Sequence, residues 1–197
     1  MSWWKKSDSD ELNTLSFKMP QWLVEWERTL PRKFVGDEAA MRVAVSAATL
    51  NVEKGTGGPF GAVLVESETG ALLSVGANLV VSAHSSVFHA EILAIMRAQQ
   101  AAKFHNVGGA GVIVATLYTS AEPCAMCMGA IPWSGIRRVV CGASDADVRA
   151  IGFDEGDKPA DWIAAYEKRG IAVTVGVLQD EASKVLRDYK EHGGVMY

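Results

Sequence analysis

The chain has 197 residues, 49% hydrophobic and 21% charged, so it can bury a full core as one globular domain. Its formal net charge of −4 argues against a nucleic-acid partner, which a basic surface would mark. No apolar run approaches the roughly 20 residues that a membrane span needs, and residues 1–8 turn acidic where an export signal would turn apolar. We therefore expect a cytoplasmic protein without membrane contact.

The first 36 residues are predicted to form an N-terminal extension. Residues 1–18 are polar and are expected to be loosely ordered. A short helix is predicted between Pro20 and Pro31, because proline suits the first turn of a helix and cannot continue one.

The predicted main domain, residues 37–192, begins with a helix. Asp37 is its expected cap and Gly55 its expected end, since apolar residues recur at helical spacing between them. Two apolar stretches follow, residues 60–65 and 71–77, and only a short turn separates them. They are predicted to pair as an antiparallel hairpin.

The middle of the chain predicts a helix and then a third strand. The helix is expected over residues 86–102, with Ser85 or Ser86 as its cap. A glycine-rich break at 108–111 precedes the strand, which is predicted over 112–119.

Two further strands are predicted at residues 138–141 and 171–175. About thirty residues separate them, with helical patterns at 145–151 and 161–168. A connection of that length with helix inside it is a crossover, so the fourth and fifth strands are expected to run parallel.

The chain is predicted to close with a helix that starts at Asp180 and ends at the Gly193-Gly194 pair. Residues 193–197 are assigned to a C-terminal tail, of which 195–197 are expected to be free. One cysteine, Cys141, lies on the apolar run of the fourth strand. It is expected to be a core residue, not a reactive thiol.

Three residues form a metal-binding pattern: His89, Cys124 and Cys127. One imidazole and two thiolates can hold three corners of a zinc tetrahedron and leave the fourth for water. Cysteines three apart at the start of a helix lie on one face, and Pro123 is suited to entering such a helix. The chain has only three cysteines, which excludes a four-cysteine structural site.

Glu91 supplies a carboxylate two residues after His89. Both side chains can point towards one metal-bound water if they occupy a first helical turn, and the carboxylate can then handle that water's proton. A lone C-x-x-C is often a structural half-site or a redox pair, and a lone H-x-E is common by chance. Their occurrence together favours a catalytic zinc site.

The H-x-E…P-C-x-x-C combination is typical of zinc-dependent base deaminases, and residues 37–192 resemble the cytidine deaminase-like superfamily. Within them, residues 119–135 resemble the guanine and tRNA adenosine deaminase branch, and 150–156 resemble a segment of bacterial guanine deaminases. The resemblance implies a three-layer α/β/α fold with a five-stranded mixed sheet whose strands 4 and 5 are parallel. It also implies one zinc per chain and a homodimer.

Further site residues follow from the same resemblance. Asn78 would hold the base, and Glu155 would contact the amino group that is lost, with Asp154 the second choice for that role. Phe60 and Phe153 could sandwich a planar base. Without the resemblance, the asparagine would be interpreted as an ordinary turn residue at a strand end. The two acidic residues would then belong to a solvent-exposed turn, and the two phenylalanines would be packing residues.

Ala90, between His89 and Glu91, is a further substrate contact that the resemblance implies. Guanine presents N–H donors at N1 and N2, so a second carboxylate suits it, whereas adenine and cytosine present a ring acceptor there. The leading hypothesis is hydrolysis of guanine to xanthine and ammonia. The alternatives are a deaminase of guanosine, an s-triazine such as ammeline, cytosine or tRNA adenosine, and a zinc-binding protein without catalysis.

Overall fold

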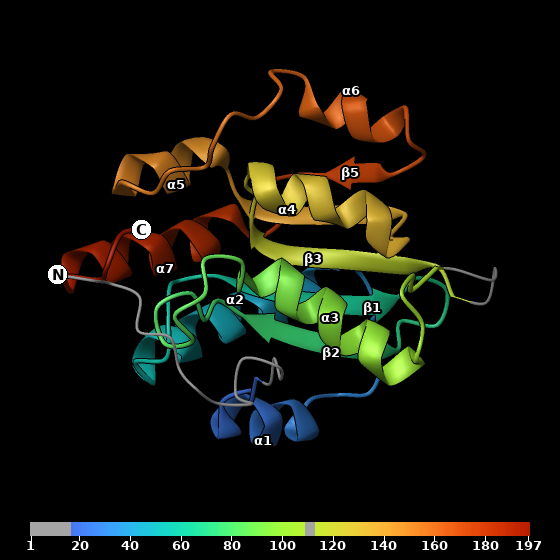
Figure 1. Ribbon diagram of the computed structural model, residues 1–197, viewed down its shortest axis with the longest axis horizontal. Helices are drawn as coiled ribbons and strands as arrows, with labels where there is room; N and C mark the ends of the chain where they lie inside the picture. Colours follow the sequence, from blue (N-terminus) through green and yellow to red (C-terminus); the bar gives the residue numbers. More distant parts are fainter. Residues whose placement is uncertain (1–16, 109–112) are drawn as a thin grey trace, which may run out of the picture.

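The computed structural model describes residues 17–108 and 113–197. The expected loose order of residues 1–16, most of the glycine-rich break and the first residue of the predicted third strand therefore lie outside the described residues. The elements in chain order (Figure 1) are α1 Gln21–Thr29, α2 Asp37–Glu53, β1 Gly61–Glu66, β2 Leu72–Ala77, α3 Ala90–Ala102, β3 Ala115–Ala121, α4 Ala125–Ala130, the 3₁₀ helix Ile131–Ser134, β4 Arg138–Ala143, α5 Asp145–Ile151, α6 Trp162–Glu167, β5 Ala172–Thr174 and α7 Gln179–Glu191.

The five strands form one mixed sheet in the order β2-β1-β3-β4-β5. β1 pairs antiparallel with both β2 and β3, which confirms the predicted hairpin. β3, β4 and β5 run parallel, which confirms the crossover inferred from the spacing of the last two strands. α1 lies beside the β2 edge of the sheet and α6 beside the β5 edge (Figure 1).

Helices cover both faces of the sheet, as the predicted α/β/α fold requires. α2, α5 and α7 pack on one face with Val63 and Val65, and α3, α4 and α6 pack on the other with Ala62 and Leu64. Successive side chains of a strand point to opposite faces, so β1 is buried on both sides. That burial explains why its sequence is a nearly continuous apolar run.

Two predicted helix starts were wrong, that of α3 by four residues and that of α2 by one. α3 begins at Ala90, and its N-cap is His89 with an extended backbone (φ −69°, ψ 157°), so neither Ser85 nor Ser86 caps it. α2 begins at Asp37 with Gly36 as its N-cap. Apolar periodicity locates a helix well, but it cannot locate the residue at which the backbone turns extended.

Four strands begin or finish at the same end of the sheet, beyond which the cavity residues gather. β3 starts at Ala115, three residues later than predicted, and runs on to Ala121, where it delivers the chain to α4. The carboxyl end of β4 lies beside that of β3 and leads into α5. The pairing of Gly61 with Ala77 brings the start of β1 and the end of β2 to this same end of the sheet. In sheets of this kind ligands bind outside the carboxyl ends of the parallel strands.

A glycine sets how closely α3 approaches the sheet. A Cβ on Gly76 of β2 would lie 2.0 Å from the carbonyl oxygen of Ala90, in the first turn of α3. Any other residue would push that turn, and with it His89 and Glu91, away from the sheet. Among the helices of the described residues, none has both the length and the apolar character to cross a membrane.

Candidate active site

The three predicted metal ligands come together. The ligand atoms of His89, Cys124 and Cys127 all lie within 4.8 Å of one another, and Cys124 Sγ is 3.5 Å from His89 Nδ1. His89 and Cys124 are the N-cap residues of α3 and α4, and both have extended backbones. Both helices pack on the same face of the sheet, so their first turns converge on this point.

The protonation of the two cysteines fits a metal centre. A hydrogen bond from the Cys127 thiol lowers the pKa of Cys124 to about 4, so one thiolate is present at neutral pH. The same hydrogen bond, together with burial, raises the pKa of Cys127. A bound zinc ion deprotonates a coordinating thiol outright. One imidazole and two sulfurs with an open side therefore fit zinc in a catalytic type of site.

Glu91 lies in the first turn of α3, as predicted, and its side chain is buried. Burial raises its pKa, which favours a carboxylate that exchanges a proton during a reaction. Cys141 is fully buried in β4, as expected, and burial raises the pKa of its thiol.

A cavity of about 260 Å³ opens beside the ligand cluster. His89, Glu91 and Cys124 line it, together with four of the residues predicted for the substrate: Phe60, Phe153, Asp154 and Glu155. Sequence reasoning assigned none of its other lining residues to the substrate, and these are Val80, Ser86, Ala121, Glu122 and Tyr197.

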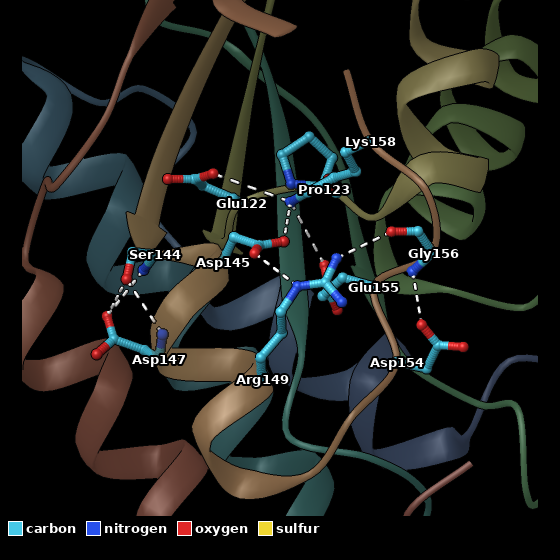
Figure 2. A network of polar contacts seen from close by, with 10 residues as sticks. All are labelled: Glu122, Pro123, Ser144, Asp145, Asp147, Arg149, Asp154, Glu155, Gly156 and Lys158. Atoms are coloured by element: carbon cyan, nitrogen blue, oxygen red, sulfur yellow. Dashed lines mark hydrogen bonds and ion pairs between the residues drawn. The ribbon is translucent and has the colours of Figure 1, made fainter. Parts of the chain in front are cut away.

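The structure distinguishes the two neighbouring carboxylates. Asp154 is exposed, and its Oδ1 accepts a hydrogen bond of 2.9 Å from the Gly156 amide, as in a turn (Figure 2). Glu155 is 6% exposed, and its Oε2 has no hydrogen-bond partner among the described residues. The Glu155 carbonyl accepts a 2.9 Å hydrogen bond from the Ala125 amide, which fixes this segment against α4. The geometry therefore favours Glu155 for a substrate contact.

The environment of Glu155 is unusual for a carboxylate. Burial, followed by the negative charge of Cys124, raises its pKa to about 8, and the charge of Glu91 adds to the effect. Among the charges that act on it, the ammonium of Lys158 opposes this rise. A carboxyl with a pKa close to neutral can accept and return a proton at physiological pH.

Asn78 is 1% exposed and does not itself line the cavity, but it hydrogen-bonds Tyr197, which does. Its Oδ1 accepts a 2.6 Å hydrogen bond from the Tyr197 hydroxyl, whereas its Nδ2 has no partner among the described residues. Its backbone carbonyl accepts a 2.6 Å hydrogen bond from the buried Asn51 side chain. Asn78 thus offers one free donor. Ala90 is buried at the start of α3 and, like Asn78, does not line the cavity, so its substrate contact stays a prediction.

The prediction of a free C-terminal tail is wrong. Tyr197 lines the cavity, hydrogen-bonds Asn78 and packs edge-on against Phe153 with ring centroids 5.1 Å apart. Upstream, the Tyr189 hydroxyl donates a 2.9 Å hydrogen bond to the Val195 carbonyl. A tail of a few residues has no periodicity, so the sequence carried no local signal for this placement.

The predicted sandwich of a base between Phe60 and Phe153 is also wrong. The two rings pack edge to face against each other, with centroids 5.0 Å apart. A base stacked between two rings needs a centroid separation of roughly 7 Å, twice the van der Waals contact distance. Both rings instead form part of the cavity wall.

Comparisons with known proteins agree with this geometry. Residues 35–143 match the family model "Cytidine and deoxycytidylate deaminase zinc-binding region". The guanine deaminase of Bacillus subtilis (strain 168) is 38% identical over 130 residues, which cover 63% of this chain and 79% of that protein.

Solved structures are similar over nearly the whole chain. The guanine deaminase of Nitrosomonas europaea superposes with a TM-score of 0.86 and 41% identity, covering 91% of this chain and 97% of that one. A protein in complex with 2,6-diaminopurine superposes with a TM-score of 0.88 and 42% identity, covering 94% and 97%. With its ligand cluster, its buried Glu91 and these matches, the chain belongs to the zinc-binding family of cytidine and deoxycytidylate deaminases.

Proposed function

We propose that this protein deaminates guanine to xanthine and ammonia. The observation that carries the proposal is the buried Glu155 carboxylate, which faces the same cavity as Glu91 and the ligand cluster. Guanine presents two adjacent N–H groups along the edge that would meet such an acceptor. The guanine deaminases among the similar proteins and the bound 2,6-diaminopurine of another support the same choice.

The reaction divides between the two buried carboxylates. His89, Cys124 and Cys127 would hold the zinc ion, which activates water for attack on a ring carbon when bound. Glu91 takes a proton from that water and passes it to the ring nitrogen next to the attacked carbon. Glu155 accepts a hydrogen bond from N1–H or N2–H of the base and then carries the second proton of the added water to the leaving amine, while the new carbonyl forms as the C–N bond breaks. Water is consumed and ammonia is released, so the atoms balance.

Asn78 and Glu155 would orient the base. The free Nδ2 of Asn78 donates to a ring acceptor, and the carboxylate of Glu155 accepts from the opposite edge. Adenine would set its own N1 acceptor against Glu155, and the ionised form of that carboxyl, which accepts from guanine, has no hydrogen to donate to it. The proposed pair therefore selects guanine over adenine by hydrogen-bond matching.

We further propose that the protein acts in the cytoplasm as a homodimer with one zinc per chain. The large aromatic Trp133 is 75% exposed, and aromatic side chains are enriched in protein interfaces. The molar mass in solution, measured by light scattering, tests the dimer.

The proposed activity is tested by ammonia release from guanine, guanosine, adenine, cytosine, ammeline and a tRNA anticodon stem-loop. We expect the highest kcat/KM with guanine. Glu91→Gln should lower kcat by about 10²–10⁴-fold and keep its zinc, because only the proton acceptor is removed. The exposed glutamate of α7, changed as Glu181→Gln, is the matched control and should keep wild-type activity.

Two results would overturn the proposal. A higher kcat/KM for another substrate would assign the enzyme to that base or nucleoside. Absence of ammonia release from every substrate by zinc-loaded protein would leave a zinc-binding protein without catalysis.

A further inference from the structure

A buried lysine lies behind Glu155. The side chain of Lys158 is 7% exposed, and its ammonium meets groups from three separate segments (Figure 2). It lies 2.5 Å from Asp145 Oδ1 at the start of α5 and donates a 3.3 Å hydrogen bond to the carbonyl of Pro123, the residue before the ligand Cys124. It also lies 3.8 Å from Glu155 Oε2.

The charges around this ammonium explain why a lysine is buried there. Glu122, Asp145 and Glu155 all have a carboxylate oxygen within 4 Å of Lys158 Nζ. Across the described residues, Lys158 is the only cation that pairs with either Glu122 or Glu155. A buried carboxylate without a partner is costly, so the lysine offsets charges that the fold has gathered at this point.

The segment that carries Glu155 is held on two sides. On one side, Lys158 ties it to Asp145 and to the loop before α4. On the other side, Arg149 donates a 2.9 Å hydrogen bond to the Gly156 carbonyl and contacts Asp145 Oδ2 at 2.7 Å (Figure 2). These contacts join the segment that carries Glu155 to the start of α5 and to Pro123, the residue before the ligand Cys124.

Lys158 acts from outside the cavity. It does not line the cavity beside the ligand cluster but a neighbouring hollow, together with Asp145, Arg149 and Trp162. At 3.8 Å its contact with Glu155 is an ion pair too long for a direct hydrogen bond, which leaves the carboxylate lone pairs available to a bound base.

We propose that Lys158 is a positioning residue that holds the Glu155 carboxylate against the bound base, an inference that rests on the proposed function of this site. Its hydrogen bond to the Pro123 carbonyl fixes the position of the Glu155 carboxylate relative to the metal ligands. Lys158 also supplies the one lysine or arginine charge within 4 Å of that carboxyl among the described residues. A misplacement of about 1 Å at such a point can cost about 10²-fold in rate.

The test is a double-mutant cycle on zinc-loaded protein with guanine. Lys158→Met keeps a long side chain and removes the charge. It should lower kcat by about tenfold or more, and change KM less, if the lysine positions a group that acts in the reaction. In the Glu155→Gln background the same change should cost less than about twofold, because nothing is left to position. The exposed Lys184 of α7, changed as Lys184→Met, is the matched control and should have no effect.

The cycle separates this inference from the proposed function. If the losses from Lys158→Met and Glu155→Gln multiply in full, Lys158 has only a structural role and the inference is overturned, while Glu155 keeps its role. If Glu155→Gln turns over guanine normally, the proposed role of Glu155 falls and the inference falls with it. If Lys158→Met does not fold, Asp145→Asn, which removes the nearest anion of the same ammonium, takes its place in the cycle under the same criterion.

Discussion

Asn78 and Tyr197 are 119 positions apart in the sequence, and one hydrogen bond joins them at the cavity. Burial raises the pKa of the Tyr197 phenol, so it stays protonated and donates to Asn78 Oδ1. That contact fixes which end of the Asn78 amide is free, and the free end is the Nδ2 donor. Gly58 makes room for it, since a Cβ there would lie 2.4 Å from the Tyr197 hydroxyl oxygen.

We therefore expect Tyr197→Phe to weaken the binding of guanine and not to abolish turnover. The phenyl ring keeps its packing against Phe153, but Asn78 Oδ1 loses the shorter of its two hydrogen bonds and keeps that from the Val80 amide at 3.3 Å. A single neutral hydrogen bond is worth about 0.5–1.5 kcal/mol, so KM should rise about two- to tenfold with a smaller change in kcat. Steady-state kinetics with guanine measure both. An unchanged KM would show that Asn78 is held well enough by its backbone contacts.

Sequence motifs predicted the metal ligands and Glu91, because fixed short spacings with helix starts carry that information locally. The structure confirms that the three ligands converge and brings Glu91 to the same cavity, where its catalytic role stays a prediction. The roles of Asn78 and Glu155 stay predictions, although burial now separates Glu155 from Asp154. Sequence reasoning gave no role to Lys158 or Tyr197, because each acts only through residues that the tertiary fold brings to it.

At the scale of elements, the sequence predicted topology better than boundaries. The length of the connection between β4 and β5 set their parallel direction, which is a constraint on chain geometry and needs no knowledge of packing. The start of α3 was wrong because apolar residues continue upstream of it, whereas the extended backbone of His89 ends the helix. The same extended backbone presents the ligand side chain, so the boundary error fell at a functional residue.

A capping box at α5 gives a pH-dependent prediction. The Asp147 carboxylate accepts a 2.9 Å hydrogen bond from the Ser144 amide and another of 2.9 Å from Gln179 Nε2. Burial alone would raise the pKa of Asp147, but the hydrogen bonds from Ser144 and Gln179 lower it from its ordinary value of 3.8 to about 2. A lowered pKa means that the ionised form stabilises the fold, fully above 3.8 and progressively less as the pH falls towards 2.

Asp147→Asn should therefore destabilise the protein by about 1 kcal/mol at neutral pH, the usual cost of a lost helix cap. The difference from wild type should shrink as the pH falls below 3.8 and vanish only below 2. Urea unfolding at a series of pH values measures the free energy of unfolding of both proteins. A difference that stays constant with pH would show that the carboxylate charge at Asp147 has no part in the cap.

At the scale of the whole molecule, α1 completes the fold at the open edge of the sheet. Glu27 accepts a 3.0 Å hydrogen bond from the Val75 amide of β2 and pairs with Arg97 of α3, which donates to the Val75 carbonyl. An unpaired edge strand invites association with other chains, and this ion pair satisfies part of that edge. Leu23 of α1 is fully buried in the same core as α2 and α7.

The sequence predicted a main domain that begins at residue 37, which implies that this domain folds without α1. The contacts of α1 make that implication testable. Leu23→Ala should lower the free energy of unfolding by about 2–5 kcal/mol, the usual cost of a cavity at a fully buried leucine. Val35→Ala, at a side chain 92% exposed, is the matched control and should stay within about 0.5 kcal/mol of wild type.

A chain of residues 37–197 lacks both Leu23 and the hydrogen bond from the Val75 amide of β2 to Glu27. We expect it to unfold at lower temperature and to aggregate. Thermal unfolding and light scattering of the three proteins measure this. If the shortened chain melts like wild type, residues 37–197 fold alone and α1 is an accessory that packs on a finished domain.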